Sequence, residues 1–376
     1  MNKIDPKLLN VFLLENCEKS VECVVYSNNF LKTKKSLEKF RFIEFPFINA
    51  FGLILNKSNI LDVAEFNHVN YIASGAKVFA QINVAKEIVD VESLYQQKIF
   101  GENITVAVID TGIYPHLDFI FPKNRIIAFK DFVNGKTYPY DDNGHGTFVA
   151  GALCGGGVVN KKYMGVAPKV NVVSLKALNS NGETGALTIL EAMQWIFDNR
   201  KKYNIKVVCM SFGANPLRTS DPLKRGAERL WNDGIVVVSA GGNSGPEGET
   251  IKSPGISPKI ITVGALDDHR NENDEFDEKL FSVAEFSSRG PAFSFLKPDC
   301  LASGVNIKGL KNSKELFTKM SGTSVSTPIV AGVCALICEK YSGISPNRVK
   351  YLLLKNAQTL TKNRLEEGYG IINSNV

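Results

Sequence analysis

The sequence predicts a protein of the α/β class, built on a mainly parallel sheet and preceded by a small α+β module. Two observations support this. From about residue 100, continuous runs of Val and Ile alternate with longer segments of helical character. Such runs are typical of strands buried on both faces of a parallel sheet, joined by right-handed crossovers. Before residue 80 the apolar segments are shorter, and they suggest strand, helix, two strands, helix and strand in turn.

The first 80 residues contain the elements of a ferredoxin-like module, whose order is β-α-β-β-α-β. Ser58 can cap the second helix, and Ile60 and Val63 help to give that helix an apolar side. The expected strands span residues 21–26, 41–47, 50–55 and 71–73, and the expected helices span residues 30–40 and 58–69.

Polar residues follow several of the apolar strands in the larger part of the chain. The strands are expected at residues 104–109, 170–175, 207–211, 235–239 and 260–263, and helices at 187–199 and 223–232. Asp110, Ser211 and Asn243 stand at or just after the ends of three strands. Because ligands and catalytic groups gather at the carboxyl ends of the strands in such sheets, we expect a site there.

The composition is that of a globular protein. With 376 residues, the chain is long enough for one large domain and a small one. Its 44% hydrophobic and 22% charged residues exclude a disordered chain, a collagen-like repeat and a small disulfide-stapled scaffold. The net charge of +6 is a mild excess without a concentrated basic stripe, so no nucleic-acid partner is expected.

The cysteines and the N-terminus suggest a cytoplasmic protein. Seven cysteines cannot all pair within one chain, and none forms a C-x-x-C pair that would indicate zinc or a redox motif. Most stand in apolar runs, where buried thiols behave as small hydrophobes. We find no signal peptide and no apolar stretch near 18 residues, so neither secretion nor a membrane span is expected.

Three short motifs suggest nucleophilic catalysis. They are Asp110-Thr-Gly, Gly-His145-Gly-Thr and Gly-Thr-Ser324. Each alone has a simpler interpretation, as a turn, a loop or a helix cap. Together they supply what hydroxyl attack on an amide needs: a nucleophile, a base for its proton, and a carboxylate that orients the base and stabilises its positive form.

The three motifs, in the order Asp, His and Ser, resemble those of the subtilisin family of serine proteases over about residues 95 to 370. The resemblance implies a three-layer α/β fold with a mainly parallel sheet in a catalytic domain at residues 81–376. It also implies a serine endopeptidase that hydrolyses proteins through Asp110, His145, Ser324 and an acyl-enzyme. The loop at residues 155–162 and the segment 125–133 look most like the intracellular bacterial AprX-like branch.

The resemblance also implies how a polypeptide substrate would bind. Asn243 would pair with the Ser324 N–H in an oxyanion hole. The substrate would add as a strand between residues 211–213 and a loop containing Gly182 and Gly185. The walls of its side-chain pocket would be Ser211, Phe212 and Gly213 on one side and Ser239, Ala240, Gly241 and Gly242 on the other. Lys252 falls at the bottom of this pocket. It either points inward and favours an acidic side chain, or points to solvent and leaves an apolar preference.

No cofactor for catalysis is expected, and a structural calcium ion is the one metal to consider. The family's calcium loop corresponds to residues 155–162, which contain two Lys and no carboxylate. Calcium prefers several oxygen ligands, including carboxylates. We therefore expect that site to be absent, although Asp118 resembles one of its ligands. Asp267, Asp268 and the acidic run 272–278 could bind an ion or form a solvated loop.

Residues 1–80 are then expected to be a propeptide, an intramolecular inhibitor that assists folding of a slowly forming parallel sheet. The resulting zymogen would cleave itself between about residues 75 and 85. A catalytically silent pseudoprotease that regulates a partner is one alternative. An esterase of unrelated fold is another, but it would need a G-x-S-x-G motif, which does not surround Ser324.

Departures from the usual family pattern occur near the catalytic segments. Phe148 replaces a common His, and Ser303 replaces a common Pro. The helix after the serine reads Val325-Ser326 at its start and has Ile329 after its Pro. These changes are expected to alter packing around the serine helix rather than the catalytic atoms.

Overall fold

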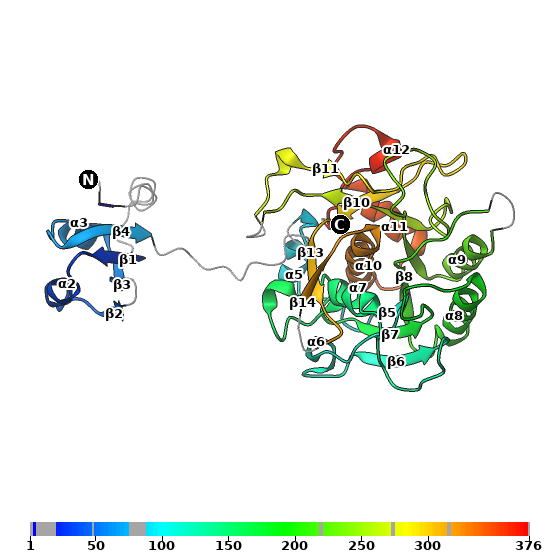
Figure 1. Ribbon diagram of the computed structural model, residues 1–376, viewed down its shortest axis with the longest axis horizontal. Coiled ribbons are helices and arrows are strands. Elements are labelled where there is room, and N and C mark those ends of the chain that lie inside the picture. Colours follow the sequence, from blue (N-terminus) through cyan, green and yellow to red (C-terminus); the bar gives the residue numbers. More distant parts are fainter. Residues whose placement is uncertain are drawn as a thin grey trace. The chain divides into compact units, whose positions relative to one another are not determined.

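The computed structural model describes residues 3–4, 20–46, 49–74, 88–217, 221–271, 275–313 and 317–374. The chain divides into two compact units, Met1–Phe79 and Ala80–Val376 (Figure 1). Each unit has a hydrophobic core of its own.

The N-terminal unit is a four-stranded antiparallel sheet in the order β2-β3-β1-β4, with two helices. Its elements are β1 (Val21–Ser27), α2 (Phe30–Ser36), β2 (Phe42–Phe45), β3 (Ala50–Leu55), α3 (Lys57–Ala64) and β4 (Val69–Ser74). This is the predicted order. The predicted cap of the second helix was wrong: Asn56 caps α3, accepting the Asn59 N–H at 3.0 Å. The helix therefore begins before Ser58 and ends well before Val69.

The two faces of this small sheet differ in burial. Side chains of successive residues alternate between the faces of a strand. Leu53 and Leu55 of β3 are buried in the core, whereas Ile54 between them is exposed. Ile43 of β2 and Tyr71 of β4 are exposed as well. One face thus packs in the core of the unit, and the other presents apolar side chains.

The larger unit is built on the predicted, mainly parallel sheet. Its strand order is β11-β10-β9-β8-β5-β7-β6, with β12 beside β10, and every pairing except β10 with β11 is parallel. The strands are β5 (Thr105–Asp110), β6 (Ile126–Asp131), β7 (Asn171–Lys176), β8 (Ile205–Met210), β9 (Val236–Ala240), β10 (Ile261–Asp267), β11 (Ser282–Val283) and β12 (Cys300–Ser303). All residues of β5 and β9 are buried, as the continuous apolar runs predicted.

Helices cover both faces of this sheet, which gives three layers (Figure 1). Helices α7 (His145–Cys154) and α10 (Thr323–Lys340) lie on one face, and α8 (Ala186–Asn199) and α9 (Pro222–Asn232) lie on the other. The other elements are α5 (Glu92–Gln96), α6 (Leu117–Ile120), α11 (Pro346–Lys355), α12 (Arg364–Glu367), the 3-10 turns η2 (Lys161–Tyr163) and η3 (Glu278–Leu280), and the hairpin β13 (Ile307–Leu310) with β14 (Phe317–Met320).

Helix α10 is the central helix of the core. It begins at Thr323, one residue before the predicted start, and Pro328 lies in its first two turns. Among the described helices it alone is long and apolar enough to cross a membrane, but 83% of it is buried in the unit. Its hydropathy therefore reflects its place in the core.

The strand order places the predicted site residues at one edge. Strands β9, β8 and β5 are neighbours and run parallel. Their carboxyl ends therefore lie side by side. Asp110 ends β5, Ser211 follows β8, and Ala240 ends β9. The fold brings these residues together from positions up to 130 residues apart.

Candidate active site

Asp110 and His145 form a hydrogen-bonded pair at this edge. Asp110 is buried at the end of β5, and His145 is the first residue of α7. The Asp110 Oδ1 atom lies 2.7 Å from His145 Nδ1 and accepts the Thr111 N–H at the same distance. This contact fixes the ring orientation. It leaves Nε2 as the nitrogen that can take a proton from a nucleophile.

The surroundings of His145 act on its pKa in opposite directions. Burial lowers the pKa by disfavouring the charged imidazolium. The charge of Asp110, the hydrogen bond from it and the charge of Asp141 raise the pKa, and together they outweigh burial. The net result is a pKa above the usual histidine value. An imidazolium formed during a reaction would be stabilised in this environment.

Glycines are needed where the two segments cross. A Cβ on Gly146 would stand 2.2 Å from the carbonyl oxygen of Gly112 and 3.1 Å from the Asp110 Cβ. Gly144, before the histidine, has a φ of 108°, which side chains rarely adopt. The glycines on both sides of His145 thus allow the helix to start against the Asp110 strand.

Ser324 lies in the first turn of α10, beside Gly322. Gly322 has a φ of 151°, and a Cβ there would be 3.1 Å from the Ser324 Oγ and 3.2 Å from the Asn243 Nδ2. The hydroxyl and the amide nitrogen therefore border the same small space, which only a glycine leaves open. No side chain caps this helix start. The N-terminus of a helix favours negative charge.

Thr323 orients the Asn243 amide, a contact that sequence reasoning missed. The Thr323 N–H donates to Asn243 Oδ1 at 2.9 Å, and the Thr323 hydroxyl donates to the same oxygen at 3.0 Å. The hydroxyl also accepts the Gly242 N–H at 3.1 Å. Because the amide oxygen of Asn243 accepts both hydrogen bonds from Thr323, the amide nitrogen is the atom that points toward Ser324. The motif Gly-Thr-Ser contained this residue without indicating its partner.

The predicted pocket walls meet around the stem of Lys252. A Cβ on Gly213 would stand 2.6 Å from the Lys252 Cβ, and a Cβ on Gly242 would stand 2.5 Å from the Lys252 Cγ. The Lys252 N–H donates to the Gly241 carbonyl at 2.8 Å. The stem thus contacts both predicted walls, while its ammonium donates to Asn215 Oδ1 at 2.8 Å. Within the walls, Ser211 and Ser239 are buried, whereas Phe212 is partly buried.

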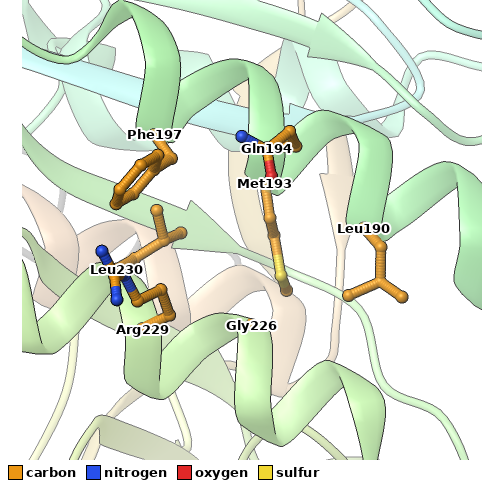
Figure 2. A pocket seen from close by; sticks show the side chains of 7 residues that line it. All are labelled: Leu190, Met193, Gln194, Phe197, Gly226, Arg229 and Leu230. Carbon is orange, nitrogen blue, oxygen red and sulfur yellow. The ribbon is translucent and has the colours of Figure 1, made fainter.

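The loop with Gly182 and Gly185 lies beside the segment that precedes His145. The Asn143 side chain donates to the Ser180 carbonyl at 2.9 Å. Gly182 has a φ of 77°, and Gly185 is the N-cap of α8. A separate groove lies between α8 and α9 (Figure 2) and contains none of the predicted site residues. It is lined by Leu190, Met193, Gln194, Phe197, Gly226, Arg229 and Leu230.

Asp118 binds backbone N–H groups where a calcium ligand was considered. It is buried, its Oδ2 accepts the Gly157 N–H at 2.7 Å, and its Oδ1 accepts the Val159 N–H at 3.1 Å. The buried Arg125 guanidinium contacts the Asp118 carbonyl oxygen. Calcium would need this carboxylate and further oxygens, but here backbone N–H donors occupy both carboxylate oxygens. The arrangement does not fit calcium.

The other acidic residues considered as ion ligands also have protein partners. Asp268 is buried and pairs with Arg270, and the Asp267 side chain accepts the His269 N–H at 2.9 Å. Residues 272–274 of the acidic run lie outside the described residues.

The departures from the family pattern change packing near the site. Phe148 is buried against Gly309, where a Cβ would stand 2.8 Å from its ring. Ser303 and Ser326 are fully buried, and their hydroxyls have no hydrogen-bond partner among the described residues.

Comparison with known proteins identifies the family. The sequence profile of the subtilase family matches residues 101–371. The chain belongs to the subtilase family. It is 39% identical to serine protease AprX of Bacillus subtilis (strain 168), over 90% of this chain and 80% of that protein. It is 33% identical to subtilisin DY of Bacillus licheniformis, over 76% of this chain and 94% of that protein.

A solved structure agrees with the fold. The crystal structure of a cold-adapted subtilisin-like serine proteinase matches with a TM-score of 0.58 and 28% identity, covering 73% of this chain and 88% of that one. This subtilase is therefore a serine endopeptidase that acts on polypeptides, as the motifs predicted.

Proposed function

We propose that this subtilase hydrolyses peptide bonds through Asp110, His145 and Ser324. The Ser324 Oγ attacks the carbonyl carbon while His145 Nε2 takes the hydroxyl proton. The carbonyl oxygen becomes an oxyanion that accepts hydrogen bonds from Asn243 Nδ2 and the Ser324 N–H. His145 then donates its proton to the leaving amine as the C–N bond breaks. Water attacks the resulting ester by the same route and restores Ser324.

The observation that most supports this proposal is the Asp110–His145 hydrogen bond of 2.7 Å, which orients the base. The second is that the Ser324 hydroxyl and the Asn243 amide border one small space at Gly322. A pseudoprotease or a binding protein has no need of either arrangement.

The proposal is tested by labelling with a serine-directed phosphonate and measuring intact mass. The wild type should gain one adduct that maps to Ser324, and Ser324→Ala should gain none. Ser342→Ala, in the exposed turn that follows the same helix, should label like the wild type. An unlabelled wild type would favour the regulatory pseudoprotease instead.

We also propose that residues 1–80 form a propeptide and that the chain is a self-processing zymogen. The N-terminal unit is compact and has its own core, as a separable inhibitor and folding helper requires. One face of its sheet exposes the apolar side chains of Ile43, Ile54 and Tyr71. The expected cut between about residues 75 and 85 lies outside the described residues, as do residues 75–87 as a whole.

Incubation of the purified full-length chain tests the processing proposal. The wild type should convert to a species with a new N-terminus near residues 75 to 85, and Ser324→Ala should stay full length. A wild type that labels with phosphonate yet stays full length would show an active protease without self-processing.

Lys252 suggests the side-chain preference of the pocket. Its stem contacts Gly213 and Gly242 on both predicted walls. Its ammonium donates to Asn215 Oδ1 in an exposed contact, so we propose a weak preference for an acidic residue before the scissile bond. Exposed ion pairs contribute up to about 1 kcal/mol, roughly a fivefold preference. Peptides with Glu, Phe or Leu at that position should show it in kcat/KM, and Lys252→Met should remove it. An equal Glu to Phe ratio in both proteins would contradict the proposal.

We retain a cytoplasmic location as part of this proposal. The six cysteines in the described ranges, Cys23, Cys154, Cys209, Cys300, Cys334 and Cys338, are all free and buried. Free thiols suit a reducing compartment. Fractionation of cells that express the full chain would test it, and recovery outside the cell would contradict it.

A further inference from the structure

Asp141 is a buried carboxylate close to the catalytic pair that the proposed reaction does not use. It lies four residues before His145 and pairs with Gly112 in an isolated bridge of the backbone. Its side chain accepts five hydrogen bonds, and only 6% of the residue is exposed. A carboxylate buried this fully, with both oxygens occupied, is a strong local anchor.

Each carboxylate oxygen of Asp141 binds one threonine hydroxyl and backbone N–H groups. Oδ1 accepts the Thr111 hydroxyl at 2.9 Å and the Gly144 N–H at 2.8 Å. It also accepts the Asn143 N–H at 3.1 Å. Oδ2 accepts the Thr147 hydroxyl at 2.6 Å and the Thr147 N–H at 2.9 Å. The N–H groups of Gly144 and Thr147 belong to the start of α7. The carboxylate therefore also caps the helix that begins at His145.

The two threonines connect the aspartate and histidine segments in a reciprocal way. Thr111 follows Asp110, and its hydroxyl accepts the Gly146 N–H from the histidine helix at 2.9 Å. Thr147 belongs to the histidine helix, and its hydroxyl accepts the Tyr114 N–H from the aspartate segment at 2.9 Å. Each hydroxyl must direct its own proton to Asp141 in order to accept that N–H. Removing the acceptor at Asp141 would therefore loosen both crossing contacts together.

The adjacent acid has a different role. Asp142 binds the Lys176 ammonium at 2.6 Å, and that buried ammonium also donates to the carbonyls of Thr111 and Leu178. Asp142 binds neither threonine hydroxyl among these contacts. It thus offers a control with the same charge, one residue away.

We propose that Asp141 is a positioning residue, which holds Asp110 and His145 in register through Thr111 and Thr147. This inference rests on the proposed use of that pair in catalysis. A displacement of about 1 Å in a catalytic group can cost about 100-fold in rate.

The charged groups that face His145 are Asp110 from β5 and Asp141 from the segment before α7. The charge of Asp142 is neutralised by its ion pair with Lys176.

The test compares Asp141→Asn with Asp142→Asn in steady-state kinetics on one peptide substrate. Asparagine keeps the shape of the side chain, but its NH₂ group cannot accept the two Thr147 hydrogens. Asp141→Asn should lower kcat by about 10- to 100-fold with KM within about twofold. Asp142→Asn should stay within about threefold of the wild type. The acid limb of the kcat/KM profile should move to lower pH in Asp141→Asn only, because a negative charge near His145 is lost.

A second pair of variants decides the matter if Asp141→Asn does not fold. Thr111→Ser keeps the hydroxyl and should retain wild-type kcat, whereas Thr111→Val removes it and should lose kcat. Equal rates in the Ser and Val variants, or an Asp141→Asn enzyme that matches Asp142→Asn in rate and pH profile, would overturn the proposal. An inactive, unlabelled wild type would instead refute the proposed catalytic function.

Discussion

We predict that Asp118 stabilises the protein through its hydrogen bonds to backbone N–H groups and that this stabilisation does not depend on calcium. The perturbation is Asp118→Asn in the inactive Ser324→Ala protein, which prevents self-digestion during the measurement. In the parent, both carboxylate oxygens hold backbone N–H groups of the loop after α7, from Gly157 and Val159. Asparagine can accept at only one of these positions, so its NH₂ group would face the other donor.

The magnitude follows from the contacts. A buried donor left without its acceptor costs about 1–3 kcal/mol, and a charge-assisted hydrogen bond contributes about 1.5–3 kcal/mol. A loss of about 3 kcal/mol is therefore expected. For a domain of about 250 residues, 1 kcal/mol lowers Tm by roughly 2 °C, and the unit that contains Asp118, Ala80–Val376, is slightly larger. The predicted drop is therefore about 6 °C.

Thermal unfolding with either calcium or a chelator is the assay. The Ser324→Ala parent should melt at the same temperature in both, because protein donors occupy the carboxylate. Asp198→Asn, an exposed acid on α8, should change little. The reasoning is refuted if calcium raises the parent's Tm by several degrees and Asp118→Asn abolishes that rise, since the carboxylate would then bind the ion.

Other consequences concern catalysis and packing. Asn243→Ala should lower kcat by about 100- to 1000-fold with little change in KM, as removal of an oxyanion donor does in subtilisin; an unchanged kcat would exclude this role. Activity should rise as pH increases through the raised pKa of His145, since the protonated ring cannot accept the serine proton; a flat pH profile across the acid and neutral range would be inconsistent with that base. Ser326→Ala should stabilise the protein by about 1 kcal/mol in denaturant melts, because a buried hydroxyl without a partner is removed. A lower midpoint would indicate a hidden partner.

The sequence predicted the parts of the fold that depend on local pattern. The buried Val and Ile runs became β5, β7, β8, β9 and β10, because a strand covered on both faces must be apolar throughout. The helix cap at Ser58 was wrong, because Asn56 also has a capping side chain and stands at the observed start of α3. Two capping residues so close together cannot be ranked from composition alone.

Contacts between distant segments could not be read from the sequence. The motifs indicated Asp110, His145, Ser324 and Asn243 as candidates, but the partner of Thr323 is 80 residues away. The sequence alone does not distinguish Asp141 from Asp142, the two acids that precede the histidine motif. The two acids differ in the folded chain, because the Asp141 carboxylate accepts the Thr111 hydroxyl and the Asp142 carboxylate binds the Lys176 ammonium. That the Lys252 stem lies against Gly213 and Gly242 is likewise a feature of the folded chain.

The acyl-enzyme is the central claim, and trapping it is the most direct test. Wild-type protein should be mixed with a peptide ester, quenched in acid within milliseconds to seconds, digested and analysed by mass spectrometry. The account predicts an acyl group on the peptide that contains Ser324, which disappears when substrate is exhausted and does not accumulate rapidly in His145→Ala. Turnover of the ester with the acyl group on another residue, or with none on Ser324 at any time, would contradict it.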